Sequence, residues 1–220
     1  MAENLNDINV FLKKLAKNNS REWMAENKPE YQATRGVFEV LIGELIAGIA
    51  SFDEGVTDLQ AKKSVFRLHR DTRFSNDKSP YKLNYGASMS KGGRKSPYGS
   101  YYIHIKPGDN FIGGGMYMPE AAELKKIRQE IDYNADELLD IINASEFQQV
   151  YGDLQGDSLK TAPKGYPKDH EHIDLLRHKG FYFLHKFPDS DLKKTDFVKE
   201  VVAKYQLIYP FVNFLNTAID

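Results

Sequence analysis

The hydrophobic pattern of this chain changes period twice, and this change limits the folds that the chain can adopt. Up to residue 63 the apolar residues recur every three or four positions, which predicts amphipathic helices. From Ser64 to about Met118 they alternate with polar residues, which predicts strands, and after Pro119 the helical spacing returns. We therefore expect an α+β fold, in which an antiparallel sheet in the middle of the chain is flanked by helical N- and C-terminal segments.

Individual elements can be assigned from the same pattern. The expected helices cover residues 5–15, 29–52, 119–131, 145–152 and 173–179, with another capped by Asn134 and a last one capped by Thr195. The expected strands cover residues 64–70, 85–90, 98–106 and 110–118, and residues 181–187 are a further strand candidate. The short connections between the central strands favour an antiparallel meander. Because no linker separates two cores, we expect a single α+β domain over residues 1–220.

Composition excludes several classes of protein. The chain has no Cys, which excludes disulfides, thiol catalysis and thiolate metal sites. The first residues lack the basic and apolar regions of a signal peptide. The longest apolar stretch, residues 37–52, is interrupted by glutamate and glycine, which argues against a membrane span. We therefore expect a soluble cytoplasmic protein with no membrane partner.

The central stretch, residues 64–84, contains many charged side chains, which cannot contribute to a hydrophobic core. Residues 62–95 contain ten Lys or Arg and two Asp, although the net charge of the whole chain is −1. Such clustering forms either a solvated surface or a local positive field for an anionic ligand. We favour the second interpretation and expect a pocket for a small phosphorylated or carboxylated ligand. Whether a reaction follows binding stays open.

The central stretch also carries a long sequence motif: FRLHRDTRFS over residues 66–75, then Lys78, residues 80–82 and Asn84. This motif resembles the signature of the uncharacterised family catalogued as domain of unknown function 2461. Three further segments resemble the same family: residues 18–23, 113–120 and 162–166. The resemblance therefore covers nearly the whole chain, with Met24 standing where an aromatic residue is expected. The family name implies no activity and no catalytic residues.

Alternation along the strands predicts which side chains share a face of the sheet. The faces that we expect to be polar or open carry Arg67, His69 and Asp71 on strand 64–70, Tyr102, His104 and Lys106 on strand 98–106, and Gly113 and Gly115 on strand 110–118. If these faces coincide, the sheet carries a pocket with room above the glycines. The alternative is a solvated polar face with a bulge at the glycines.

The expected ligand-binding residues combine these faces with the loop that follows the first strand. Arginine offers planar bidentate contact to phosphate or carboxylate, and lysine offers a point charge. The candidates are Arg67, His69, Arg70, Arg73, Lys78, Tyr81, Lys82, Tyr102, His104, Gly113 and Gly115. Four of them are expected to converge on one anion: Arg67, His69, Arg73 and Lys82. The alternative is that the cations are surface charges or partners of Asp71 and Asp77.

Catalysis has weaker support in the sequence. His69 with Asp71 is a weak candidate for a general base with an orienting carboxylate. Residues 69–76 match the kinase catalytic-loop pattern H-R-D-x-x-x-x-N, but no D-F-G motif follows and no glycine-rich loop with a strand lysine precedes it.

The cluster Asp169–His172 has metal-ligating side-chain types, but adjacent residues rarely converge on one ion. We therefore predict that it holds no metal, and we expect no cofactor.

Two other classes of function stay open. A nucleic-acid-binding protein would contact phosphates through Lys62, Lys63, Lys91, Arg94 and Lys95. The near-neutral charge and the sequence pI of about 6.6 weigh against this class. A protein-interaction module would use the arginine-rich motif as a structural clamp. A compact concave site favours the small ligand, a broad basic stripe favours nucleic acid, and internally paired arginines favour the clamp; the oligomeric state stays open.

Overall fold

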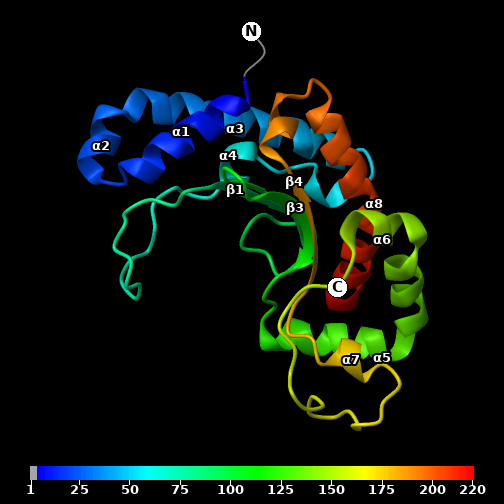
Figure 1. Cartoon of the computed structure of the whole chain (residues 1–220). Coiled ribbons are helices and arrows are strands. Elements are labelled where there is room, and N and C mark those ends of the chain that lie inside the picture. The colour runs from blue at the N-terminus through cyan, green and yellow to red at the C-terminus, as the bar shows by residue number, and fades with distance from the viewer. Residues whose placement is uncertain (1–3) are drawn as a thin grey trace.

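The computed structural model describes residues 4–220 (Figure 1). Its helices are α1 (Asn6–Lys17), α2 (Arg21–Glu26), α3 (Lys28–Ile49), α4 (Ala61–Ser64), α5 (Ala121–Asn143), α6 (Ser145–Tyr151), α7 (Ile173–Leu176) and α8 (Phe197–Ile219). Its strands are β1 (Tyr85–Ser90), β2 (Ser100–Ile105), β3 (Asn110–Met116) and β4 (Phe181–Phe187). Short 3₁₀ turns lie at Glu54–Val56 and Asp189–Lys193.

The strands of residues 4–220 form a four-stranded antiparallel sheet in the order β1-β2-β3-β4. Short connections join β1, β2 and β3 into a meander, whereas β4 follows β3 only after α5, α6 and α7. The N-terminal third before the sheet and the C-terminal segment after it are helical (Figure 1). The predicted α+β class is therefore confirmed, and the strand candidate over residues 181–187 is confirmed as the fourth strand.

The predicted strand over residues 64–70 is wrong. Helix α4 includes the first of these residues, and Val65 and His69 make isolated bridges to Ala87 and Tyr81 instead of a continuous ladder. One reason is Pro80, which has no N–H to donate. Its carbonyl oxygen accepts a hydrogen bond from the N–H of Arg70 at 2.9 Å. The central stretch is thus an extended, irregular segment beside the edge of β1.

Two helix caps also differ from expectation. Helix α5 continues through Asn134 with a kink, at φ −130° and ψ 37°. The Nδ2 of Asn134 donates to Glu130 on the preceding turn, and within the described residues its Oδ1 accepts no backbone N–H, so the capping hydrogen bond is not formed. Helix α8 begins after Asp196 and has no side-chain cap, so the predicted cap by Thr195 is not formed.

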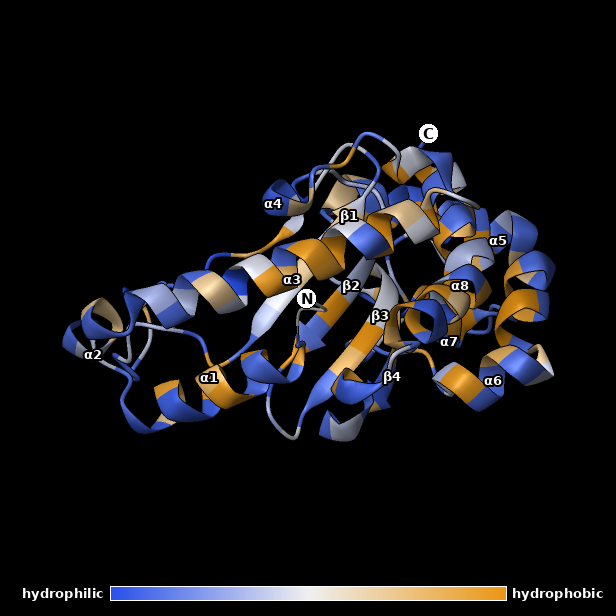
Figure 2. Ribbon diagram, turned by 90° about the horizontal axis from the view of Figure 1, so that it is seen from above, coloured by the Kyte–Doolittle hydropathy of each residue, from blue (hydrophilic) through white to orange (hydrophobic). Residues whose placement is uncertain are grey.

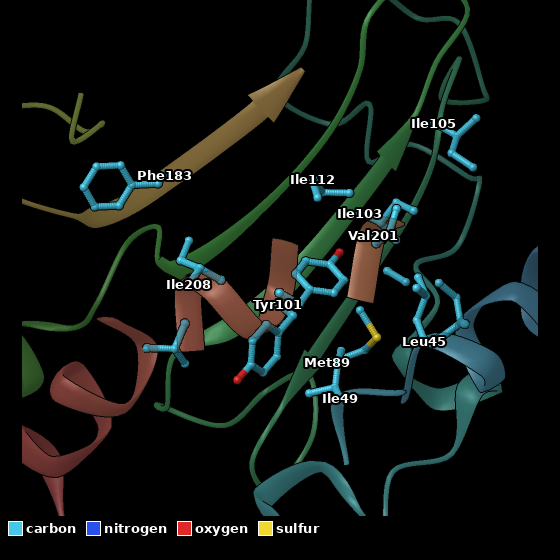
Figure 3. Close-up of a cluster of buried hydrophobic side chains, with 14 of the residues drawn as sticks. Leu45, Ile49, Met89, Tyr101, Ile103, Ile105, Ile112, Phe183, Val201 and Ile208 are labelled. Carbon is cyan, nitrogen blue, oxygen red and sulfur yellow. The ribbon is translucent and has the colours of Figure 1, made fainter. Parts of the chain in front are cut away.

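One face of the sheet packs against α3 and α8. The alternate residues of β2 on this face are buried, as the parity argument predicts: Tyr101, Ile103 and Ile105. Figure 3 shows this face of the sheet meeting side chains from both helices: Leu45, Ile49, Val201 and Ile208. The surrounding helices mix hydrophobic and hydrophilic residues, as amphipathic helices do (Figure 2). Over residues 4–220, none of the helices has both the length and the apolar character that crossing a bilayer requires.

The turn between α1 and α2 fastens the central stretch. The side-chain amide of Asn19 donates to the carbonyl oxygen of Tyr81 at 3.0 Å and accepts from the N–H of Tyr81 at 3.1 Å. The buried ring of Tyr81 meets the ring of His69 edge-on, with centroids 4.9 Å apart. Asn19 therefore supplies the backbone partners that a neighbouring strand would otherwise supply to Tyr81.

We expect Asn19→Ala to lower the free energy of unfolding by about 1–2 kcal/mol, because two part-buried hydrogen bonds are lost. Urea unfolding followed by circular dichroism measures this loss. Asn18 is the matched control, because its amide bonds to the carbonyl of Lys14 at an exposed helix end. Asn18→Ala is expected to change the free energy by less than about 0.5 kcal/mol. Equal losses in the two variants would contradict the fastening role of Asn19.

Candidate functional site

The face of the sheet opposite α3 and α8 carries a pocket of about 500 Å³, here called the sheet pocket. All four strands contribute to it, together with the central stretch. Its lining residues are Phe66, Lys82, Ser88, Ser100, Tyr102, His104, Phe111, Gly113, Gly114, Gly115, Tyr117, Tyr182, Phe183 and Leu184. Most of this lining is apolar or aromatic, and the polar groups are few, as is usual for small-molecule sites.

The floor of the sheet pocket follows from strand pairing. Tyr102 lies opposite Gly113 and Ser100 lies opposite Gly115 in the β2–β3 ladder. A Cβ atom on Gly113 would come within 2.3 Å of the carbonyl oxygen of Phe183 on β4, so only glycine allows the two strands to approach this closely. The floor is therefore flat between the aromatic side chains of β2 and β4.

A hydrogen-bonded pair, Tyr102 and His104, lies on this floor. The hydroxyl of Tyr102 is 3.2 Å from Nδ1 of His104, and the side-chain Nδ2 of Asn84 is 3.5 Å from the same atom. Because Asn84 can only donate through Nδ2, Nδ1 is the acceptor and the Tyr102 hydroxyl donates to it. Gly86 makes room for this arrangement, since a Cβ there would lie 2.6 Å from the Tyr102 hydroxyl.

Burial sets the protonation states of this pair. It lowers the pKa of His104 to about 4 and raises the pKa of Tyr102 to about 12. At neutral pH both side chains are therefore uncharged. The imidazole ring of His104 also stacks on Phe111, with centroids 4.5 Å apart and planes within 10°. The pair thus offers hydrogen-bonding groups without adding charge.

Positive charge gathers at one edge of the sheet pocket, around the ring of Phe66. The Nζ of Lys82 lies 5.5 Å from the ring centroid, and the guanidinium carbon of Arg94 lies 4.9 Å from it. Burial lowers the pKa of Lys82, and the charges of Arg67 and Arg94 lower it further. Within residues 4–220, the ion pairs to carboxylates involve none of these three cations.

The charged loop of the central stretch is held by internal ion pairs. Arg70 pairs with Asp77, and Arg73 makes two contacts with Asp71, at 2.9 and 2.6 Å. The hydrogen bonds from Arg73 lower the pKa of Asp71, and those from Ser79 and then Arg70 lower the pKa of Asp77. Because these carboxylates neutralise their arginines, the loop is partly a structural clamp.

A second hollow, of about 390 Å³, lies between this loop and the start of α2 and is here called the loop hollow. Its lining is mostly polar: Asn19, Ser20, Arg21, His69, Arg70, Thr72, Lys78 and Pro80. The Nζ of Lys78 donates to the carbonyl oxygen of Thr72 at 3.0 Å. The loop hollow therefore has positive charge but lacks the apolar walls of the sheet pocket.

The structure divides the eleven candidate ligand-binding residues between these places. The sheet pocket receives Lys82, Tyr102, His104, Gly113 and Gly115. The loop hollow receives His69, Arg70 and Lys78. The other three candidates, Arg67, Arg73 and Tyr81, line neither the sheet pocket nor the loop hollow.

The four residues expected to converge on one anion therefore do not line one pocket in this structure. The two catalytic candidates, His69 and Asp71, also contact different residues. The ring of His69 packs against Tyr81, and Asp71 binds Arg73. Lys106 turns to Asp109 at 3.1 Å, away from the sheet pocket.

Sequence reasoning missed the aromatic walls of the sheet pocket. Phe66, Phe111 and Tyr182 were not candidates, although each adjoins one in sequence or in the sheet, and neither was Tyr117, two residues after Gly115. Alternation along residues 181–187 marks Tyr182 and Leu184 as sharing a face, but the sequence does not say which strand lies beside it. The missing information was the pairing of β3 with β4 across a long helical insertion.

The cluster Asp169–His172 is engaged in local contacts. Nε2 of His170 lies 2.8 Å from Asp132, and its Nδ1 accepts from the N–H of His172 at 3.0 Å. Within the described residues 4–220, no group of three or more His, Asp or Glu side chains is arranged to hold a metal ion. Metal analysis of the purified protein, with a His170→Ala, His172→Ala double variant, remains the test of the predicted absence of a metal here.

The lowered pKa of His104 predicts a pH dependence of stability. An unfolded histidine titrates near 6.5, whereas burial lowers the pKa of His104 to about 4. As the pH falls, the unfolded chain therefore binds this proton first. The contribution of neutral His104 is complete above about pH 6.5 and is lost progressively towards pH 4.

Because His104 is partly exposed to solvent, we expect the loss between pH 7 and pH 5 to be about 1 kcal/mol. Urea unfolding at the two pH values measures it. His104→Gln should show a correspondingly smaller fall, and His69→Gln, at an exposed histidine, serves as the matched control. An identical pH dependence in wild type and His104→Gln would contradict the prediction.

Comparison with known protein families gives one match. The model of a family described as conserved hypothetical protein (DUF2461) matches residues 7–214. No curated protein and no solved structure matches the chain. The matched range includes every residue of the sheet pocket and of the loop hollow.

Proposed function

The chain belongs to the DUF2461 family of conserved hypothetical proteins, and we propose that it binds a small ligand carrying a phosphate or carboxylate group in the sheet pocket. The family description names no activity, so the proposal rests on the site itself. The observation that carries it is the pair of cations over the ring of Phe66, Lys82 and Arg94, neither of which forms an ion pair with a carboxylate in the described chain. Such cations repel one another until an anion neutralises them.

The walls of the sheet pocket favour a ligand with an apolar or aromatic body. Phe66, Tyr102, Phe111 and Tyr182 line it from different elements, and the glycines of β3 leave a flat floor between them. A planar group lying on this floor would bury aromatic surface on both sides. The uncharged Tyr102–His104 pair would then accept or donate hydrogen bonds to polar groups of the ligand.

The structure supports this proposal better than nucleic-acid binding. Of the basic residues expected to contact phosphates, Lys91 pairs with Asp220 at 3.0 Å, so a carboxylate already neutralises its charge. The ion pairs of Arg70 and Arg73 favour a structural role for the charged loop of the central stretch. This role is compatible with a ligand in the sheet pocket.

Thermal and urea unfolding with added anions test the proposal. A ligand that binds only the folded chain stabilises it by about 2.7 kcal/mol at 100 times its dissociation constant. We expect such a shift with phosphate, sulfate or aromatic carboxylates, above a chloride control of equal ionic strength. If no anion in this set changes the stability, the proposed anion site is ruled out for these classes and the clamp becomes the better account of the motif.

A further inference from the structure

We infer that the ligand of the sheet pocket carries a long apolar chain, which crosses the sheet from the β1 side to β4 and ends in a neighbouring hollow. The ligand class is therefore an acyl or alkyl chain with a carboxylate or phosphate head. The inference rests on the proposed function, because the head is the anion that the sheet pocket would bind. It adds the chemistry of the rest of the ligand and its direction across the sheet.

A hollow of about 480 Å³, here called the adjoining hollow, borders the sheet pocket. Tyr117 and Tyr182 line both spaces, and their rings meet edge-on with centroids 5.2 Å apart. The two spaces therefore meet at this tyrosine pair. The other residues lining the adjoining hollow are Met118, Pro119, Ala121, Leu124, Arg128, Gly156, Asp157, Leu159, Lys179 and Gly180.

The cationic edge of the sheet pocket and the tyrosine pair lie at opposite ends of it. Phe66 and Lys82 belong to the central stretch beside β1, where the N–H of Phe66 donates to the carbonyl oxygen of Gly86 at 2.9 Å. Tyr182 lies on β4, the last strand in the order β1-β2-β3-β4. Neighbouring strands lie about 4.8 Å apart, so the path from β1 to β4 is about 14 Å long. A small anion at Lys82 leaves most of this path empty, whereas a long chain fills it.

The path between these ends is apolar. The rings of Tyr102 and Phe111 flank it with centroids 5.8 Å apart, and Gly113 and Gly114 leave the floor between the strands without side chains. Beyond the tyrosine pair, apolar side chains such as that of Leu124 continue the lining. An apolar chain buried along this path gains free energy with each methylene group, without needing polar partners.

Two large apolar side chains stand exposed where the two spaces meet. Tyr117 is 69% exposed and Met118 is 78% exposed, although both follow directly on the buried end of β3. Exposed apolar side chains beside a hollow often mark a binding surface. The chain of the ligand would cover both of them, so its course explains an exposure that the fold itself does not require.

Charge decides which end of the ligand lies where. No carboxylate lines the sheet pocket, whereas Asp157 lines the adjoining hollow and would repel an anionic head. The guanidinium of Arg128, in the same hollow, donates to the carbonyl oxygens of Leu176 at 2.7 Å and His178 at 3.0 Å, so it holds the end of α7. The head therefore belongs beside Lys82 and the chain end in the adjoining hollow.

A series of straight-chain acids tests the path. The probes are hexanoate, octanoate, decanoate and dodecanoate below their critical micelle concentrations, titrated into the whole protein by calorimetry. We expect the dissociation constant to fall by about fourfold for each added methylene group. Decanol lacks the anionic head and should bind about 10- to 100-fold more weakly than decanoate. Decyl phosphate compares the phosphate head with the carboxylate.

Variants of α5 separate the chain end from the head. Ala121→Trp puts a bulky side chain into the adjoining hollow and should weaken dodecanoate by about tenfold, the loss of about two buried methylene groups, while leaving hexanoate unchanged. Ala122→Trp is the matched control, because Ala122 is the next residue of α5 and lines neither space. It should bind both acids like wild type. Lys82→Ala acts at the head and should weaken both acids by the same factor.

The outcomes distinguish the path from the anion site. If hexanoate and dodecanoate bind equally, or if Ala121→Trp binds dodecanoate as wild type does, the path is overturned and the anion site stands. If Ala121→Trp weakens hexanoate as much as dodecanoate, the chain length is not read in the adjoining hollow and the path is also overturned. If none of the acids, phosphate or sulfate binds, both ideas fail. Decanol binding as tightly as decanoate would overturn the ligand class, because the anionic head would then contribute nothing.

Discussion

Replacing Gly115 by alanine is expected to lower the free energy of unfolding by about 3–5 kcal/mol. Gly115 lies on β3 with φ +119°, a conformation that side chains other than glycine rarely adopt. A Cβ atom there would lie 2.2 Å from the carbonyl oxygen of Phe181 and 2.9 Å from the ring of Phe211. Backbone strain and overpacking therefore add, and the β3–β4 contact that closes the sheet pocket should open.

Urea unfolding followed by circular dichroism and tryptophan fluorescence measures the effect. Gly36→Ala is the matched control, because Gly36 lies within α3 and nothing lies within 4 Å of its added Cβ atom. That substitution should stabilise the protein by up to about 1 kcal/mol, through helix propensity alone. A Gly115→Ala variant as stable as wild type would show that β3 can relax, and the close approach of β4 would not require glycine.

The sequence predicts the sheet well where one face is buried and the other is open. Along β2, Tyr101 and Ile103 face the core while Tyr102 and His104 face the sheet pocket, and simple alternation gives this division. The same alternation fails for residues 64–70, because a strand also needs a partner with free backbone groups. The neighbouring segment there contains Pro80 and makes only scattered bridges over the described residues.

The candidate site could be predicted only in part, because its contacts join residues that no local pattern connects. The sequence indicates that the central stretch is rich in cations, but charge count does not say which cations are neutralised. Asp71 and Asp77 bind Arg73 and Arg70, whereas Lys82 faces the aromatic pocket. These outcomes depend on a few loop dihedral angles that no periodic pattern encodes. The contribution of β4 depends on pairing between strands that are distant in sequence, which local propensity does not determine.

Lys82→Ala is expected to remove most of the stabilisation that anions give, while leaving the fold intact. Losing a hydrogen bond to a charged group weakens binding by up to about 100-fold. At an anion concentration that stabilises the wild type by about 2.7 kcal/mol, the variant would then gain only about 0.4 kcal/mol. Thermal unfolding at a series of phosphate or aromatic carboxylate concentrations, with chloride at equal ionic strength, measures both values.

Variants in the loop hollow decide where the anion binds. Lys78→Ala removes a cation of the same type from the loop hollow, and Arg70→Ala breaks the ion pair with Asp77. If the sheet pocket is the site, Lys78→Ala should keep the full anion stabilisation, and Arg70→Ala should lower the stability of the protein equally with and without anions. If Lys78→Ala loses the stabilisation and Lys82→Ala keeps it, the anion site lies in the loop hollow instead. Loss in both variants would favour a diffuse positive field over a pocket, because a field sums over all nearby charges and is screened by salt.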